Sequence, residues 1–280
     1  MKEGILYSTG QLDCLAYYAK VFPKIKSFVG DREIATKTWI PESIPPFILH
    51  RGSDDPPLRL SDIKVTQSLL KKRVGKKLHE VEKELSEKEK LIWRYFVPRK
   101  FVELHYACNY EGPGKSFDRV FIDIDAGKNI QEAKYIDVVK QLLKEIRADN
   151  ELRKLASFRI YLLWTGRSIH VYLLLNKKLP HSAYNTYFAF TKSTLTTKWA
   201  QKISEKTKTK VKAGHERTAG AIILDTSATP SGKLARCPYS LHLSSKGKFN
   251  GVSVPLKEKD IKLGLFNKLK GLTPEKALSY

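Results

Sequence analysis

The sequence predicts an α+β fold, with mixed and antiparallel sheets flanked by helices. Runs of β-branched and aromatic residues follow one another closely, as the strands of hairpins do, and do not alternate one by one with helices. Two long segments place apolar residues at helical spacing and supply the flanking helices. The hydrophobic fraction of 41% is that of a globular protein with a sizeable core.

The first half of the chain predicts fewer regular elements than the second. We expect a short helix over 1–20, a strand over 33–40 and a strand over 101–108. Between the last two lies a charged helical region, 61–96, which Gly75 can divide in two. Because acids and bases are interspersed along this region, we interpret it as a solvated face and not as a binding surface.

The second half predicts a compact succession of strands and helices. Asn129 precedes the helix as an N-cap, with Glu132 three residues on, which is a capping-box pattern. No internal repeat stands out, so we expect one domain, 1–280, ending in a basic tail at 257–280. The expected elements are strands over 119–125, 158–164, 169–175 and 220–225, helices over 130–148 and 182–205, a basic loop over 206–217, and a strand-rich remainder with a short helix in the tail.

The charge balance points to a polyanionic partner. Lys and Arg total 51 against 29 Asp and Glu, a net charge of +22. Nucleic acid is the favoured partner; a membrane surface is the weaker alternative, because no basic helix has a clean apolar face. No run approaches the roughly 18 apolar residues of a membrane span, and no signal peptide opens the chain, so we expect a cytoplasmic location.

The cysteine pattern fits the same location. Three cysteines, Cys14, Cys108 and Cys237, lie far apart and show neither zinc-ligand spacing nor a disulfide framework. We therefore expect a reducing compartment and no structural zinc. Abundant lysine with a single methionine is also typical of proteins from hot habitats.

Two aspartates two residues apart form the first candidate site. Asp123 and Asp125 interrupt a run of β-branched and aromatic residues that predicts a buried strand. Side chains two apart on a strand share a face, with Cα atoms roughly 7 Å apart. Two such carboxylates can converge on a pair of divalent cations about 4 Å apart. The alternative is a strand end with two solvated acids.

A tight turn forms the second candidate site. Gly166 permits a turn whose N–H groups can approach a phosphate, and Arg167 offers a planar fork for phosphate oxygens. Thr165 adds a hydroxyl, and His170 stands just inside the following strand, facing the same space. The alternative is a plain hairpin turn with an exposed arginine and a structural histidine.

A third candidate segment starts at Asp225, which again ends an apolar strand and suits a further metal carboxylate. Arg236, Ser240 and His242 follow and would add donors for a triphosphate. Each can also be an ordinary surface residue, since aspartate at a strand-to-turn junction is usually turn chemistry.

The order of these segments resembles the archaeo-eukaryotic primase superfamily, and most of all the catalytic small subunit of archaeal and eukaryotic primase. That family shows an hhhDhD strand, an S-G-R-G-x-H turn, a strand-borne aspartate and an R-x-P-x-S-L-H stretch. Here they correspond to Val120–Asp125, Thr165–His170, Asp225 and Arg236–His242. The stretches Asp31–Ile34, Leu104–Pro113 and Gly251–Leu256 are similar too, so that the resemblance spans roughly 30–256.

The resemblance implies a primase-polymerase catalytic core. Asp123, Asp125 and Asp225 would be catalytic and would bind two Mg²⁺ or Mn²⁺ ions. The partners would be a single-stranded DNA template, nucleoside triphosphates and a primase large subunit or accessory replication protein. The triphosphate would be held by Thr165, Gly166, Arg167, His170, Arg236, Ser240, His242 and Lys246.

The chain departs from the family pattern at several positions. Ser168 replaces the usual glycine of the turn, and Cys108 stands where a serine is common. The lysine that usually follows the last histidine closely is displaced to Lys246. Either Lys246 reaches the phosphates from a longer loop, or Lys233 or Lys248 does so, or the contact is lost. The Cys/His zinc site of many small subunits has no ligand set here.

Three functions remain open from the sequence. The first is a primase that starts short primers on single-stranded DNA. The second is a polymerase of the same superfamily that extends ends during repair or past lesions. The third is a basic nucleic-acid-binding module without activity, which the intact carboxylates disfavour.

Overall fold

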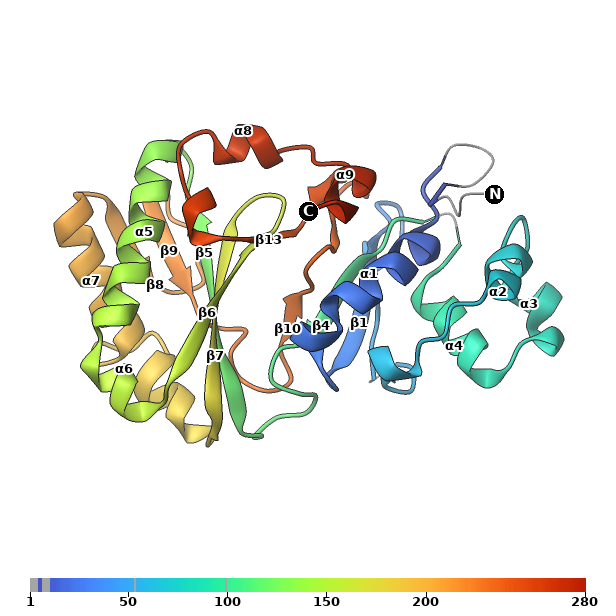
Figure 1. Ribbon diagram of the computed structural model, residues 1–280, viewed down its shortest axis with the longest axis horizontal. Helices are drawn as coiled ribbons and strands as arrows, with labels where there is room; N and C mark the ends of the chain where they lie inside the picture. Colours follow the sequence, from blue (N-terminus) through green and yellow to red (C-terminus); the bar gives the residue numbers. More distant parts are fainter. Residues whose placement is uncertain (1–4, 7–10, 53, 99) are drawn as a thin grey trace. The chain divides into compact units, whose positions relative to one another are not determined.

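The computed structural model describes residues 5–6, 11–52, 54–98 and 100–280, and its chain forms two compact units (Figure 1). Each unit combines helices with mixed or antiparallel sheets, which confirms the α+β class. That both units form one catalytic domain stays a prediction. Unit one comprises Met1–Ala107, Leu234–Ser253 and Gly271–Tyr280, and unit two comprises Cys108–Lys233 and Val254–Lys270.

Unit two is built on a six-stranded sheet in the order β13-β6-β7-β5-β9-β8. All neighbours are antiparallel except β8 and β9, which run parallel. The strands are β5 (Phe117–Ala126), β6 (Phe158–Trp164), β7 (Ile169–Leu179), β8 (Lys210–Ala213), β9 (Ala221–Asp225) and β13 (Val254–Leu256).

Helices cover one face of this sheet (Figure 1). The long helices α5 (Glu132–Ala148) and α7 (Leu195–Thr207) pack against each other, and α6 (Asn150–Leu155) follows α5. Their buried stripes include Val139, Leu143 and Trp199. The strands turn their apolar residues toward these helices, so the polar residues of the alternation gather on the opposite face. The remaining helices of unit two are η3 (Tyr184–Phe188), η4 (Glu258–Asp260) and α8 (Leu265–Leu269).

Unit one holds a second antiparallel sheet in the order β10-β4-β1-β2, with β3 also paired to β1, and a two-stranded ladder of β11 and β12. Helix α1 (Cys14–Val29) is anchored by two tyrosine hydroxyls. Tyr17 donates to the Tyr239 carbonyl at 2.8 Å, and Tyr18 donates to the Val102 carbonyl at 2.7 Å. The strands are β1 (Glu33–Trp39), β2 (Phe47–His50), β3 (Leu58–Arg59), β4 (Glu103–Ala107), β10 (Leu234–Arg236), β11 (Leu241–Leu243) and β12 (Phe249–Val252).

The charged region 61–96 is helical but divided. Gly75 adopts φ 72°, a left-handed conformation that ends a helix. Ser86 then starts a new one, because its hydroxyl accepts the Glu89 N–H. The pieces are η1 (Leu60–Asp62), α2 (Gln67–Lys72), α3 (Leu78–Val81), η2 (Glu82–Glu84) and α4 (Glu87–Tyr95), and α9 (Pro274–Leu278) closes the basic tail.

Two helix predictions are misplaced. The helix expected over 1–20 is α1, which begins only at Cys14 because Asp13 caps it, and continues to Val29; residues 1–4 and 7–10 of the prediction lie outside the described residues. The helix expected over 182–205 is two elements, η3 and α7. Thr194 caps α7 by accepting the Thr197 N–H, and this starts a new helix inside the predicted one.

Two local predictions are wrong. Asn129 does not cap α5: it has φ 69°, a conformation that asparagine adopts more readily than most residues, and the helix begins at Glu132. The Glu132 carboxylate instead accepts the Phe266 N–H at 2.9 Å. The basic loop expected over 206–217 contains β8, whose alternating lysines conceal a strand that pairs with β9.

Candidate active site

Three of the predicted residues stand in one row across unit two. Asp123 on β5 is paired in register with Asp225 on β9 and, on its other side, with His170 on β7. Residues directly opposite on neighbouring strands turn to the same face, with Cβ atoms about 5 Å apart. The sheet therefore aligns a carboxylate, a second carboxylate and an imidazole on the face opposite α5 and α7.

The Asp123 carboxylate is held by two polar side chains. Its Oδ1 accepts a hydrogen bond from the Ser168 hydroxyl at 3.0 Å and lies 3.4 Å from His170 Nε2. Ser168 is the residue that replaces the glycine of the family pattern. Its hydroxyl thus fixes the orientation of the first carboxylate, a role that glycine cannot perform.

Asp125 shares the face of Asp123 but has a different partner. Its Oδ1 lies 2.5 Å from Nη2 of Arg217, which comes from the loop between β8 and β9. The aspartate side chain is only 13% exposed, whereas the arginine is 44% exposed. A nearly buried carboxylate is thus compensated by a cation that reaches in from solvent.

The turn between β6 and β7 is closed by Thr165. Its N–H donates to the Ser168 carbonyl at 2.9 Å, and its hydroxyl accepts the Ser168 N–H at 3.0 Å. Gly166 has φ 94°, which a residue with a Cβ rarely adopts. The turn leaves Arg167 exposed, while Ser168 and His170 are buried beside Asp123.

The pKa values of the three carboxyls shift in different directions. Burial acts to raise the pKa of Asp123, but the His170 imidazole and the hydrogen bonds of Asp123 lower it overall. Burial, followed by the charge of Asp123, raises the pKa of Asp125. Burial also raises the pKa of Asp225, although Ser227 opposes this through a backbone hydrogen bond of 2.8 Å. Arg217 therefore offsets the burial of Asp125 only in part, and Ser227 offsets that of Asp225 only in part.

This donor set fits hard divalent cations. Carboxylate oxygens are the ligands that Mg²⁺ and Mn²⁺ prefer, and a divalent cation would supply the charge that Asp125 and Asp225 lack. Asp123, Asp125 and Asp225 would hold it from two adjacent strands. Within the described part of the chain, no group of three or more His, Cys, Asp or Glu side chains is already gathered as a ligand set. Ser168, Arg217 and Ser227 each hold one carboxylate in its present orientation.

The predicted residues of the last motif belong to unit one. Arg236 on β10 donates to the Leu241 carbonyl at 2.8 Å and lies 3.1 Å from Oε1 of Glu103 on β4. The same Glu103 oxygen accepts the Leu243 N–H at 2.8 Å. The Glu103 side chain is 2% exposed. Its two contacts connect the Arg236 guanidinium to strand β11, which carries His242.

The other residues of this motif differ in exposure. Ser240 is fully buried, with its hydroxyl between the Leu104 N–H and the Leu241 carbonyl, so it organises the backbone of unit one. His242 is half-buried on β11, and Lys246 is exposed in the turn that follows. The nucleotide-binding roles of Arg236, Ser240, His242 and Lys246 stay predictions.

Sequence reasoning missed three contacts of these sites. Arg217 was included only in a general basic segment, since nothing in its neighbourhood marks it as a partner of Asp125. Ser168 was noticed only as a departure from the glycine. Glu103 carried no signal beyond a single acid in an alternating strand. The register of a strand could have suggested it, because Glu103 and His105 share a face.

A comparison with solved structures finds a related fold. The polymerase domain of Mycobacterium tuberculosis Ligase D, in complex with DNA, matches with a TM-score of 0.63 and 17% sequence identity, and the match covers 99% of this chain and 91% of that chain. This chain therefore has the fold of that polymerase domain. No protein-family model matches the chain. No curated protein matches it.

The helices are also relevant to whether a segment of the chain could span a membrane. Among the residues described above, no helix has the length and apolarity that crossing a membrane requires.

Proposed function

We propose that this protein is a template-directed nucleotidyltransferase, a DNA primase or polymerase acting on single-stranded DNA. The observation that carries the proposal is the row of Asp225, Asp123 and His170 across three strands, with Asp125 beside it on the same face. The shared fold with a polymerase domain supports the same class of reaction. The net charge of +22 supports a polyanionic template.

The chain's own residues would divide the work of the reaction. Ser168 and His170 keep Asp123 ionised and oriented, and Arg217 compensates Asp125. Divalent cations held by the carboxylates would activate the attacking hydroxyl and neutralise the charge of the leaving pyrophosphate. Arg167 is exposed at the tip of its turn and would bind phosphate oxygens. Positioning the phosphates and neutralising their charge are the main contributions that a protein makes to phosphoryl transfer.

The buried carboxylate of unit one has a supporting role in the proposal. Glu103 fixes the direction of the Arg236 guanidinium by an ion pair and a second bond to β11. The guanidinium is thereby held in a set conformation within unit one, and Lys246 is exposed in the turn after β11.

The test is nucleotide incorporation on a single-stranded template with all nucleoside triphosphates and Mn²⁺. The variant Asp123→Asn with Asp125→Asn should yield no product while its affinity for the template stays within about twofold of wild type. Asp137→Asn, an exposed aspartate on α5, is the matched control and should be fully active. Clear synthesis by the double variant would place the catalytic site elsewhere.

Two versions of the reaction separate the remaining functions. Product formed without any primer supports the primase. Product formed only from a supplied primer supports the end-extending polymerase, which the fold shared with a ligase polymerase domain favours. Template binding without either product would leave only the non-catalytic module.

A further inference from the structure

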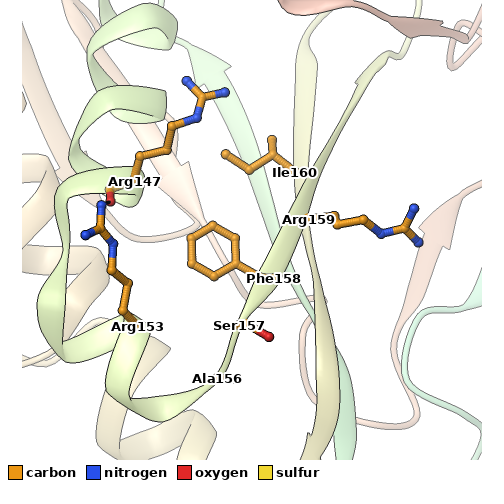
Figure 2. A pocket seen from close by; sticks show the side chains of 7 residues that line it. All are labelled: Arg147, Arg153, Ala156, Ser157, Phe158, Arg159 and Ile160. Atoms are coloured by element: carbon orange, nitrogen blue, oxygen red, sulfur yellow. Dashed lines mark hydrogen bonds between the residues drawn. The ribbon is translucent and has the colours of Figure 1, made fainter.

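We propose that the outer edge of β6 in unit two is a docking site for an extended acidic peptide of another protein. A cavity of about 580 Å³ runs along this edge (Figure 2). It is lined by Arg147 and Arg153 and by the consecutive residues 156–160. A pocket lined by consecutive residues of one strand follows the strand's edge, where backbone groups can pair with an added strand.

The backbone groups of β6 alternate between its two sides. The Ser157 carbonyl accepts the N–H of Asn176, so Ser157 and every second residue after it turn toward β7. The backbone groups of Phe158, Ile160 and Leu162 therefore point outward. On this outer side, strand β13 pairs with β6 only from Leu162 to Trp164. Among the described residues, no other strand pairs with β6 on that side.

Apolar side chains accompany this open edge. Phe158 and Ile160 are half-buried and lie on the side of β6 that faces the helices, whereas Arg159 points the other way (Figure 2). A strand added here would place every second side chain over Phe158 and Ile160. The edge thus offers backbone pairing and an apolar contact in the same register.

The charges beside the edge select for acids. Arg147, at the end of α5, forms a two-pronged ion pair with Glu258, with Nη1 2.8 Å from Oε1. Glu258 stands two residues beyond Leu256, the last residue of β13. Within this chain, strand β13 thus pairs with the edge of β6, and Glu258 just after it forms an ion pair with Arg147. Arg153, whose guanidinium also donates to the Arg147 carbonyl, extends the positive charge along the open part.

These features favour a peptide over the other occupants. A nucleic acid has no row of backbone donors and acceptors that would match Phe158 and Ile160. A second copy of the chain would set the arginines of one β6 edge against those of the other. An extended peptide with alternating acids and apolar residues satisfies the edge and the apolar contact and places an acid beside Arg153, while Arg147 stays paired with Glu258.

The test uses fluorescence anisotropy with the full chain and a short fluorescein-labelled peptide that alternates glutamate with valine. Wild type should bind it at concentrations on the order of 10 μM. Arg153→Glu, and Arg147→Glu with Arg153→Glu, should weaken binding about tenfold or more. Lys134→Glu is the control, since it makes the same charge change at an exposed position of α5 that does not line the cavity, and it should change the affinity less than about twofold.

Backbone pairing is tested on the peptide, so that folding of the protein is not at issue. Two methylated peptides are compared, one with its odd-numbered backbone nitrogens methylated and one with its even-numbered nitrogens methylated. Only one of these sets of N–H groups would point toward β6. Methylation of that set should abolish binding, and methylation of the other set should leave it unchanged. Equal binding of both methylated peptides would overturn the proposal, as would equal losses for Arg153→Glu and Lys134→Glu. Dimerisation of the chain through this edge would also overturn the proposal. The same holds if Arg153→Glu lowers the affinity for single-stranded DNA and leaves the affinity for the peptide unchanged.

Discussion

Asp123, Asp125 and Asp225 are three carboxylates with three different compensations. Asp123 has a hydroxyl and an imidazole, Asp125 has one partly exposed guanidinium, and Asp225 has a backbone N–H. An ionised carboxylate near a like charge and away from water is costly. The ionised side chains of Asp125 and Asp225 therefore destabilise the fold.

Replacement of Asp225 makes this cost measurable. Because burial raises the pKa of Asp225, the ionised side chain destabilises the fold above that pKa, and this loss is relieved as the pH falls through it. In EDTA at neutral pH, Asp225→Asn should therefore raise the thermal midpoint by about 2 °C, whereas the exposed control Asp137→Asn should leave it unchanged.

The same variant should respond differently to metal. Mn²⁺ should raise the thermal midpoint of wild type and raise that of Asp225→Asn much less, because binding only the folded state stabilises it. An equal Mn²⁺ shift in both proteins would remove Asp225 from the metal site.

His105 predicts how unit one responds to acid. Burial, and then the Arg236 charge, lowers the pKa of His105 to about 3. Its contribution to stability is present above the unfolded pKa of 6.5 and is lost as the pH falls toward 3. Between pH 7 and pH 4.5 the free energy of unfolding should fall by about 2–3 kcal/mol more in wild type than in His105→Asn. Urea unfolding at the two pH values measures this, and parallel losses in both proteins would contradict it.

At the residue scale the sequence predicted which side chains lie together better than it predicted their partners. The structure puts Asp225, Asp123 and His170 in one row, and Asp125 lies beside them on the same face because side chains two apart on a strand share a face. The partner Arg217 could not be predicted, because its approach to Asp125 depends on how a long loop folds.

At the scale of elements, Asn109 fixes the start of β5. The side chain is fully buried and makes four hydrogen bonds, two accepted from the N–H groups of Asp118 and Arg119 and two donated to the carbonyls of Arg119 and Thr229. These bonds set the register of the strand that carries Asp123 and Asp125.

Loss of this side chain should therefore be severe. Asn109→Ala removes four hydrogen bonds to backbone groups at the start of β5 and at Thr229 and should lower the free energy of unfolding by about 3 kcal/mol. The exposed Asn185→Ala serves as a control and should change it by less than about 0.5 kcal/mol. Denaturant unfolding of the two variants gives the comparison, and similar values would mean that the Asn109 network is dispensable.

Elements with strong, unbroken patterns were predicted nearly to their ends. Strand β6 was predicted at its observed bounds, and the expected strands within β5, β7 and β9 were found. The sequence predictions were wrong where a local residue pattern is compatible with two structures. Asn129 is a good cap but also a good left-handed residue, and it takes the second role. The alternating lysines of β8 looked like a solvated loop, because its pairing with β9 is not visible in its own sequence.

At the scale of the whole molecule, the proposed function requires that the net charge of +22 drive association with a template. Binding of single-stranded DNA should weaken by about 10³–10⁵ between roughly 50 and 200 mM salt if some 6–10 phosphates are contacted. Anisotropy titrations at several salt concentrations measure the slope. A flat response would mean that the excess positive charge is not used on nucleic acid.

The central claim is that carboxylates from β5 and β9 hold divalent cations for nucleotidyl transfer. Anomalous diffraction at the manganese edge, from crystals grown with Mn²⁺ and a non-hydrolysable nucleoside triphosphate, tests it most directly. We predict peaks bound by oxygens of Asp123, Asp125 and Asp225, with the triphosphate beside Arg167. Manganese bound at other residues, or no manganese near Asp123, would contradict the account.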